Sequence, residues 1–155
     1  MADLITSSAN PVVKRMRLLG ERRHRHRESA FVVQGIQPVW QAVEAGADIE
    51  TLIVAPGLLD RSSAARGIAD MVAAQEAGGV RVARLSDELF GRLSEREGPA
   101  GLAAIVRGRM MALGELQAGP RAVFVALHEV GNPGNLGTII RTANAAGAGG
   151  VVLIG

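Results

Sequence analysis

Residues 123–155 read VFVALHEVGNPGNLGTIIRTANAAGAGGVVLIG, a pattern that predicts a strand, a glycine-rich turn, a helix and a second strand. The apolar runs Val123–Leu127 and Val151–Ile154 are short and rich in β-branched residues, as expected for buried parallel strands. Between them, Asn135 is expected to cap a helix that ends at Gly147. This order of elements predicts a β-α-β unit of an α/β domain.

The predicted helix has one apolar face, made by Leu136, Ile139, Ile140 and Ala143. At about 100° per residue, Arg141 points roughly 150° away from the centre of that face. The turn before the helix is expected to present backbone N–H groups, which favour an anionic or phosphate-bearing partner. The alternative is that Arg141 is an ordinary solvated surface residue.

The glycines of the turn exclude two common nucleotide-binding motifs. Gly131, Gly134 and Gly137 are spaced GxxGxxG, whereas a dinucleotide-binding fold has GxGxxG. The stretch also lacks the Gly-Lys-Ser/Thr ending of a P-loop. A nucleotide-binding α/β protein that uses this turn is therefore a disfavoured hypothesis.

The run NPGNLGTIIRTANAAG resembles the first signature motif of the SpoU class of SPOUT RNA methyltransferases. The motif positions that match are Asn132, Pro133, Asn135, Gly137, Arg141, Ala143 and Gly147. The resemblance continues upstream through the N-terminal substrate-binding domain of such enzymes, including the thiostrepton-resistance type. It therefore covers nearly the whole chain.

This resemblance implies an S-adenosylmethionine-dependent enzyme that methylates the 2′-hydroxyl of RNA ribose, with ribosomal RNA as the expected substrate. It assigns Arg141 to activation of that hydroxyl and Asn135 to orienting the arginine or the substrate. Arginine is a poor base, so electrostatic stabilisation of the developing alkoxide is the role that its chemistry favours. The resemblance places the methyl donor in a knotted domain whose binding motifs are expected beyond Gly155. We therefore interpret the chain as an N-terminal fragment that is inactive by itself, and expect a homodimer for the full-length enzyme.

Basic side chains are concentrated near the N-terminus, where residues 1–30 hold seven basic and three acidic side chains although the net charge of the chain is only +2. Such a cluster is typical of a polyanion-binding surface. The predicted RNA-binding residues are Lys14, Arg15, Arg17, Arg22, Arg23 and Arg25. A solvated helix and a membrane-surface helix are the alternatives. An aromatic content of 3% favours phosphate and shape contacts over base-stacking platforms.

The composition of the chain argues against a membrane-spanning protein and against a metal-binding protein. The chain has no run of about 18 apolar residues, so we expect no membrane span. It has no cysteine, which fits a cytoplasmic protein, and its three histidines lack the spacing of metal ligands, so we expect no metal site.

Four further strands are predicted upstream, and helices lie between them. The first helix is expected to start at Asn10-Pro11, another to open at Pro38, and a short one to be capped by Ser86. Ser94 and Glu97 have the spacing of a capping box. The predicted strands are 31–35, 49–55, 80–85 and 101–107.

Strands that alternate with helices predict an α/β layer sandwich with a parallel or mixed sheet. The resemblance implies a ribosomal-protein-like RNA-binding domain over 1–107, a linker over 108–120, and the first β-α-β unit of an α/β-knot methyltransferase domain over 121–155. Gln34 stands where the family usually has glutamate. A non-enzymatic, ribosomal-protein-like RNA-binding module is the alternative function.

Overall fold

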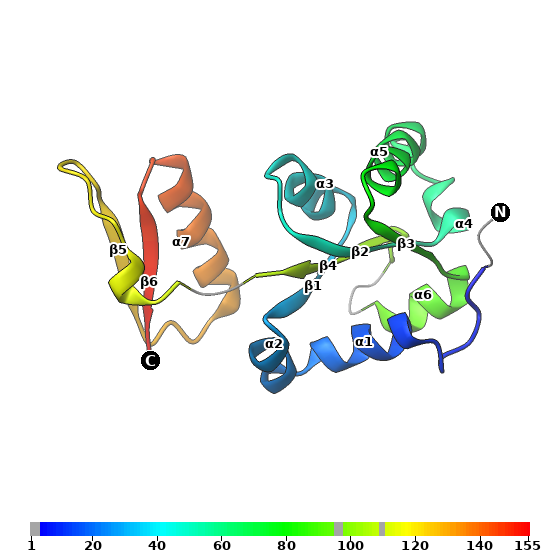
Figure 1. Ribbon diagram of the computed structural model, residues 1–155, viewed down its shortest axis with the longest axis horizontal. Helices are drawn as coiled ribbons and strands as arrows, with labels where there is room; N and C mark the ends of the chain where they lie inside the picture. Colours follow the sequence, from blue (N-terminus) through cyan, green and yellow to red (C-terminus); the bar gives the residue numbers. More distant parts are fainter. Residues whose placement is uncertain (1–3, 95–97, 109–110) are drawn as a thin grey trace. The chain divides into compact units, whose positions relative to one another are not determined.

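The computed structural model describes residues 4–94, 98–108 and 111–155, and the chain forms two compact units, Met1–Arg109 and Met110–Gly155 (Figure 1). The first unit contains a four-stranded sheet. The second contains a two-stranded sheet and a helix. Each unit is described by itself.

The sheet of the first unit is mixed, with the strand order β1-β4-β2-β3. β4 pairs with β1 and with β2 in antiparallel fashion, whereas β2 and β3 are parallel. The mixed α/β architecture predicted from the alternating pattern is thereby confirmed. The strands are β1 (Ala30–Gln34), β2 (Ile49–Val54), β3 (Arg81–Arg84) and β4 (Leu102–Arg107).

Helices cover both faces of this sheet (Figure 1). On one face, α1 and α6 bury side chains such as Val13, Leu19 and Phe90 against the strands. On the other face, α3 and α5 do so with Val39 and Ile68. β4 contributes to both cores, because successive residues of a strand point to opposite faces. The helices of this unit are α1 (Pro11–Gly20), α2 (Arg22–Glu28), α3 (Ile36–Glu44), α4 (Pro56–Leu59), α5 (Ala65–Ala77) and α6 (Asp87–Leu93).

Two of the predicted helix starts are confirmed by their caps. The side chain of Asn10 accepts a hydrogen bond from the backbone N–H of Val12, and that of Ser86 accepts one from Leu89. The third helix begins at Ile36, so Pro38 lies in its first turn and does not open it. The predicted capping box includes Glu97, which lies outside the described residues.

The second unit contains β5 (Phe124–His128), α7 (Pro133–Ala145) and β6 (Gly150–Ile154), preceded by the short 3₁₀ helix η1 (Leu113–Glu115). β5 and β6 are parallel neighbours, which confirms the predicted β-α-β unit. The prediction that both strands are buried is wrong for this chain. Ile154 is 49% exposed, because within residues 111–155 only α7 covers the sheet.

None of the helices in the described residues is both long and apolar enough to cross a membrane.

Candidate nucleic-acid interface

The basic side chains near the N-terminus lie on two consecutive helices, α1 and α2. Apolar residues of α1 face the core of the first unit, so Lys14 and Arg17 project into solvent from its opposite side. α2 is anchored by the buried His24, and Arg22 and Arg23 are exposed. The structure therefore places four of the six predicted RNA-binding side chains on the exposed surface of one pair of helices.

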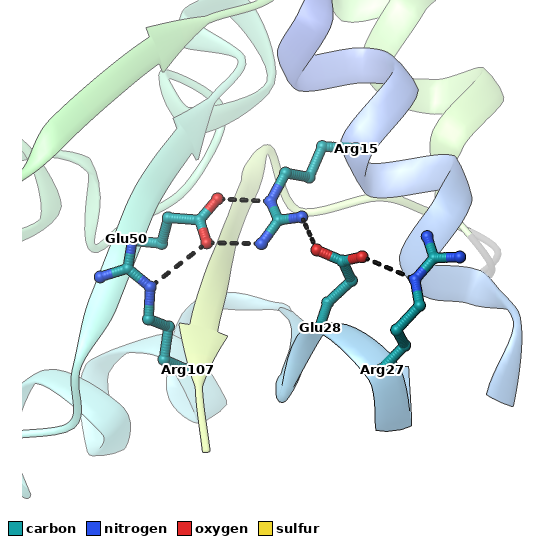
Figure 2. A network of polar contacts seen from close by, with 5 residues as sticks. All are labelled: Arg15, Arg27, Glu28, Glu50 and Arg107. Atoms are coloured by element: carbon teal, nitrogen blue, oxygen red, sulfur yellow. Dashed lines mark hydrogen bonds and ion pairs between the residues drawn. The ribbon is translucent and has the colours of Figure 1, made fainter. Parts of the chain in front are cut away.

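Arg15 has a different environment, because carboxylates surround its guanidinium (Figure 2). Its Nε and Nη2 donate to the two carboxylate oxygens of Glu50 at 2.5 and 2.8 Å, and its Nη1 donates to Glu28 at 3.2 Å. Arg107 approaches Glu50 at 3.6 Å, and Arg27 donates to Glu28 at 3.0 Å. This network ties α1 and α2 to β2 and β4, so Arg15 holds the basic helices on the sheet.

The ion pairs shift the ionisation of the residues that form them. The hydrogen bond from Arg15 is the main cause that lowers the pKa of the Glu50 carboxyl, although partial burial opposes it. For Glu28, the hydrogen bond from Arg27 comes first and that from Arg15 second, and both lower its pKa. The bond to Glu50 raises the pKa of Arg15 further above its ordinary value. These shifts favour the charged forms of Arg15, Glu28 and Glu50 at neutral pH.

Replacing Glu50 with glutamine is expected to destabilise the protein by about 1–2 kcal/mol at pH 7, between the values for exposed and buried ion pairs. Because the folded-state pKa of Glu50 is lowered, its contribution is present above the unfolded-state value of about 4.5 and is lost as the pH falls through the folded-state value. Urea unfolding at pH 7 and pH 3 measures this. The difference between wild type and Glu50→Gln should be smaller at pH 3 than at pH 7.

The control is Glu88→Gln, which removes a carboxylate from the exposed pair with Arg92. Its expected effect is at most about 0.5 kcal/mol. If the two variants lose equal free energies of unfolding at pH 7, the network around Arg15 stabilises the protein no more than an exposed ion pair does.

Arg25 also has a local partner. Its Nη1 donates to the carbonyl oxygens of Leu19 and Gly20, at the C-terminal end of α1. Lysine and arginine side chains stabilise helix C-termini in this way, because they satisfy carbonyls that have no partner in the helix. In the described part of the chain, Lys14, Arg17, Arg22 and Arg23 form no ion pair, and these four side chains are the ones free to meet phosphate.

The N-cap of α7, the helix that carries the motif of the second unit, differs from the prediction. Asn132, and not Asn135, is the N-cap of α7, and its Oδ1 accepts from the backbone N–H groups of Gly134 at 2.8 Å and Asn135 at 3.1 Å. Proline is favoured at the first helical position, which places the helix start at Pro133. Because Asn132 occupies both N–H groups, this turn offers an anion fewer donors than the sequence suggested.

Arg141 is exposed, and its side chain folds back along α7 toward the helix N-terminus. Its Nη2 donates to the hydroxyl of Thr138 at 3.2 Å, and that hydroxyl donates to the carbonyl of Gly134 at 3.0 Å. The guanidinium lies over Gly137, where a Cβ atom would approach its Nη1 to 3.2 Å. The motif glycine thus leaves room for the motif arginine, and the spacing of four residues places one above the other on the helix.

Arg141 and Asn135 lie on the same helix but on different sides of it, since six residues correspond to about 600° of rotation. Asn135 is exposed at the third helical position. The guanidinium of Arg141 reaches back one turn, to Thr138 and Gly137. Within the described residues, the hydrogen bonds of Arg141 and Asn135 go to Thr138 and Asn132, and not to each other.

Comparison with known proteins gives a consistent assignment. Residues 10–104 match the MRM3-like substrate binding domain. The 23S rRNA (uridine(2479)-2′-O)-methyltransferase of Streptomyces viridochromogenes is 31% identical over 89% of this chain and 46% of its own length. The 23S rRNA (guanosine(2553)-2′-O)-methyltransferase RlmP of Bacillus subtilis is 28% identical over 96% of this chain and 53% of its own length. The chain spans about half the length of these curated relatives.

A solved structure agrees with the sequence comparison. The AdoMet-bound rRNA methyltransferase from Sinorhizobium meliloti superimposes with a TM-score of 0.81 at 32% identity, over 99% of this chain and 54% of that one. Both curated relatives are named as methyltransferases, and neither is named as a non-enzymatic RNA-binding module. The chain belongs to the SPOUT 2′-O-methyltransferase family and carries that family's MRM3-like substrate-binding domain.

Proposed function

We propose that this chain supplies the RNA-binding domain and the first catalytic motif of an S-adenosylmethionine-dependent ribosomal RNA 2′-O-methyltransferase. The observation that carries the proposal is the exposed basic surface of α1 and α2 on a domain that matches a substrate-binding family. The relatives named as 23S rRNA 2′-O-methyltransferases support ribosomal RNA as the substrate class.

Lys14, Arg17, Arg22 and Arg23 bind RNA through its phosphates in this proposal. Arginine suits the role because its planar fork pairs with phosphate oxygens in bidentate fashion. Each neutralised phosphate releases condensed counterions, so the affinity falls as salt rises. Arg15 and Arg25 act indirectly, since they hold the two helices in place through Glu50 and through the carbonyls at the end of α1.

The double variant Arg22→Ala/Arg23→Ala is expected to bind a structured ribosomal RNA fragment more weakly, with a slope of log affinity against log salt that is smaller by about 1 per arginine. Titrations at several salt concentrations measure this slope. The matched control is Arg61→Ala/Arg66→Ala, which removes two exposed arginines at and before α5, the helix on the other face of the sheet. If both double variants keep the wild-type slope, the basic surface of α2 does not contact RNA.

In methyl transfer, S-adenosylmethionine supplies the electrophilic methyl group. The described residues of the second unit do not form a site for it, because the N–H groups of Gly134 and Asn135 are taken by Asn132 and the strand residues Leu153 and Ile154 are exposed. We therefore assign no residue of this chain to the cofactor and derive no step through it.

Arg141 has the chemistry to stabilise negative charge on the ribose oxygen as its proton leaves, because a guanidinium donates charge-assisted hydrogen bonds and remains protonated. Its remaining N–H groups can also hold the neighbouring phosphate. Asn135 offers an amide that orients the substrate from the helix N-terminus. Neither role requires Arg141 to act as a base.

The proposal also covers the domain organisation, oligomeric state and location of the enzyme. The first unit corresponds to a ribosomal-protein-like sandwich over 1–107, residues 108–120 form a linker, and 121–155 begin a knotted methyltransferase domain. The enzyme acts as a homodimer in the cytoplasm. The mixed sheet covered by helices on both faces, and the likeness to the Sinorhizobium meliloti enzyme, support the domain assignment alone.

A further inference from the structure

Thr138 is an exposed residue of α7 that is not among the matched positions of the motif. Its hydroxyl takes part in two hydrogen bonds. It donates to the carbonyl oxygen of Gly134 at 3.0 Å, and it accepts from Nη2 of Arg141 at 3.2 Å. The hydroxyl therefore links the guanidinium of Arg141 to the backbone of the first turn of α7.

The bond to Gly134 fixes how the hydroxyl of Thr138 can act. A threonine hydroxyl has a single proton, and here that proton goes to the carbonyl oxygen of Gly134. Thr138 consequently meets Arg141 as an acceptor, which is the role that a guanidinium needs because it can only donate. The bond to a carbonyl four residues earlier also selects the side-chain rotamer of Thr138. The helix backbone thus sets the position of the acceptor.

Arg141 depends on this acceptor for a defined position. Within the part of the chain that the structure describes, the hydroxyl of Thr138 is the one hydrogen-bond partner of the Arg141 side chain. A long, exposed arginine without such a bond would sample many rotamers. Gly137 leaves the space beneath the guanidinium, since a Cβ atom there would lie 3.2 Å from Nη1. Two adjacent residues therefore supply the space and the acceptor, and the other N–H groups of Arg141 remain for a substrate.

We propose that Thr138 is a positioning residue for methyl transfer, and that its hydroxyl holds the guanidinium of Arg141 where it can donate to the ribose oxygen. The inference rests on the proposed function, in which Arg141 stabilises negative charge on that oxygen. A donor that is in place before the reaction stabilises the developing charge without a cost of reorganisation. Thr138 touches no substrate in this account, so its effect is transmitted through Arg141.

Thr138→Val tests the proposal, because valine keeps the size and the β-branching of threonine but has no hydroxyl. In a protein of the relatives' length that contains this chain, the single-turnover rate at saturating ribosomal RNA should fall about tenfold, the factor that corresponds to one hydrogen bond to a charged group. The RNA concentration that gives half of this rate should change less than about twofold, because the basic side chains of the first unit are intact. Rates measured over a range of RNA concentrations separate the two quantities.

Two control variants separate the hydroxyl from a general effect on α7. Thr138→Ser restores the hydroxyl and should recover most of the wild-type rate. In Thr142→Val the lost hydroxyl is equally exposed and bonds the carbonyl of Thr138 at 3.0 Å, but among the described residues it forms no hydrogen bond with Arg141. This variant should keep the wild-type rate. Thermal unfolding checks that each variant is folded.

A double-mutant cycle distinguishes positioning from a direct role. In the Arg141→Ala background, Thr138→Val should slow the reaction no further, because no guanidinium remains for the hydroxyl to hold. If Thr138→Val slows the reaction about tenfold in that background as well, Thr138 acts independently of Arg141 and the inference is overturned.

Three other results would also overturn the inference: a wild-type rate for Thr138→Val, equal losses in Thr138→Val and Thr142→Val, or a serine variant as slow as the valine variant. The role of Arg141 in the proposed function is tested separately by Arg141→Ala. If Arg141→Ala is slow and Thr138→Val is not, the inference about Thr138 fails alone. If Arg141→Ala keeps the wild-type rate, the role given to Arg141 fails and the inference fails with it.

Discussion

Replacing Arg141 with alanine is expected to slow methyl transfer about 10²–10³-fold, the usual cost of removing a hydrogen-bond donor that stabilises a developing oxyanion. RNA affinity should fall much less than the rate, because only one phosphate contact is lost and the binding side chains of the first unit remain. The measurement is single-turnover transfer of a radioactive methyl group to ribosomal RNA, in a protein of the relatives' length that contains this chain. Arg141→Lys is expected to be nearly as slow, since lysine lacks the planar fork.

The matched control is Arg121→Ala, which removes an exposed arginine from the same unit. It should retain the wild-type rate. A rate for Arg141→Ala within about tenfold of wild type would show that this arginine is a solvated surface residue, which was the alternative that the sequence left open.

Replacing Gly101 with alanine is expected to cost the first unit about 2–5 kcal/mol of unfolding free energy, from left-handed backbone strain and overpacking together. Gly101 is buried with φ = +74°, and a Cβ there would lie 2.8 Å from Cβ of Leu58 and 2.9 Å from the carbonyl oxygen of Ala55. The backbone cannot move away easily, because Ala55 donates a 2.8 Å hydrogen bond to the carbonyl of Gly101. Urea unfolding monitored by circular dichroism measures the loss.

Gly46 provides the control for this prediction. It also has a positive φ, +65°, but a Cβ atom there would meet nothing within 4 Å. Gly46→Ala should therefore cost only the backbone strain, about 1 kcal/mol. If Gly101→Ala and Gly46→Ala destabilise the protein equally, the close contact with Leu58 and Ala55 is not what requires glycine at position 101.

Local sequence patterns predicted the secondary structure of both units well. Caps and periodicity are short-range features, so Asn10 and Ser86 could be identified as helix caps from a few neighbouring residues. The cap of α7 was misplaced by three residues because Asn132 and Asn135 are both asparagines near Pro133. Proline at the first helical position favours Asn132, and this signal was available in the sequence.

Periodicity could not show which arginines have partners. Arg15 and Glu50 are 35 residues apart, and only the packing of α1 on the sheet brings their side chains together. The sequence analysis therefore grouped Arg15 with the exposed basic residues.

The family resemblance, the β-α-β motif with Arg141 and the concentration of positive charge near the N-terminus could all be recognised from the sequence, because each depends on residues that are neighbours along the chain. The division of that charge depends on tertiary contacts: Arg15 pairs with Glu50, Arg25 caps α1, and Lys14, Arg17, Arg22 and Arg23 remain exposed. Such ion pairs form between residues that are distant in sequence. The fold sets the distance between their side chains, and the periodicity of the sequence carries no information about it.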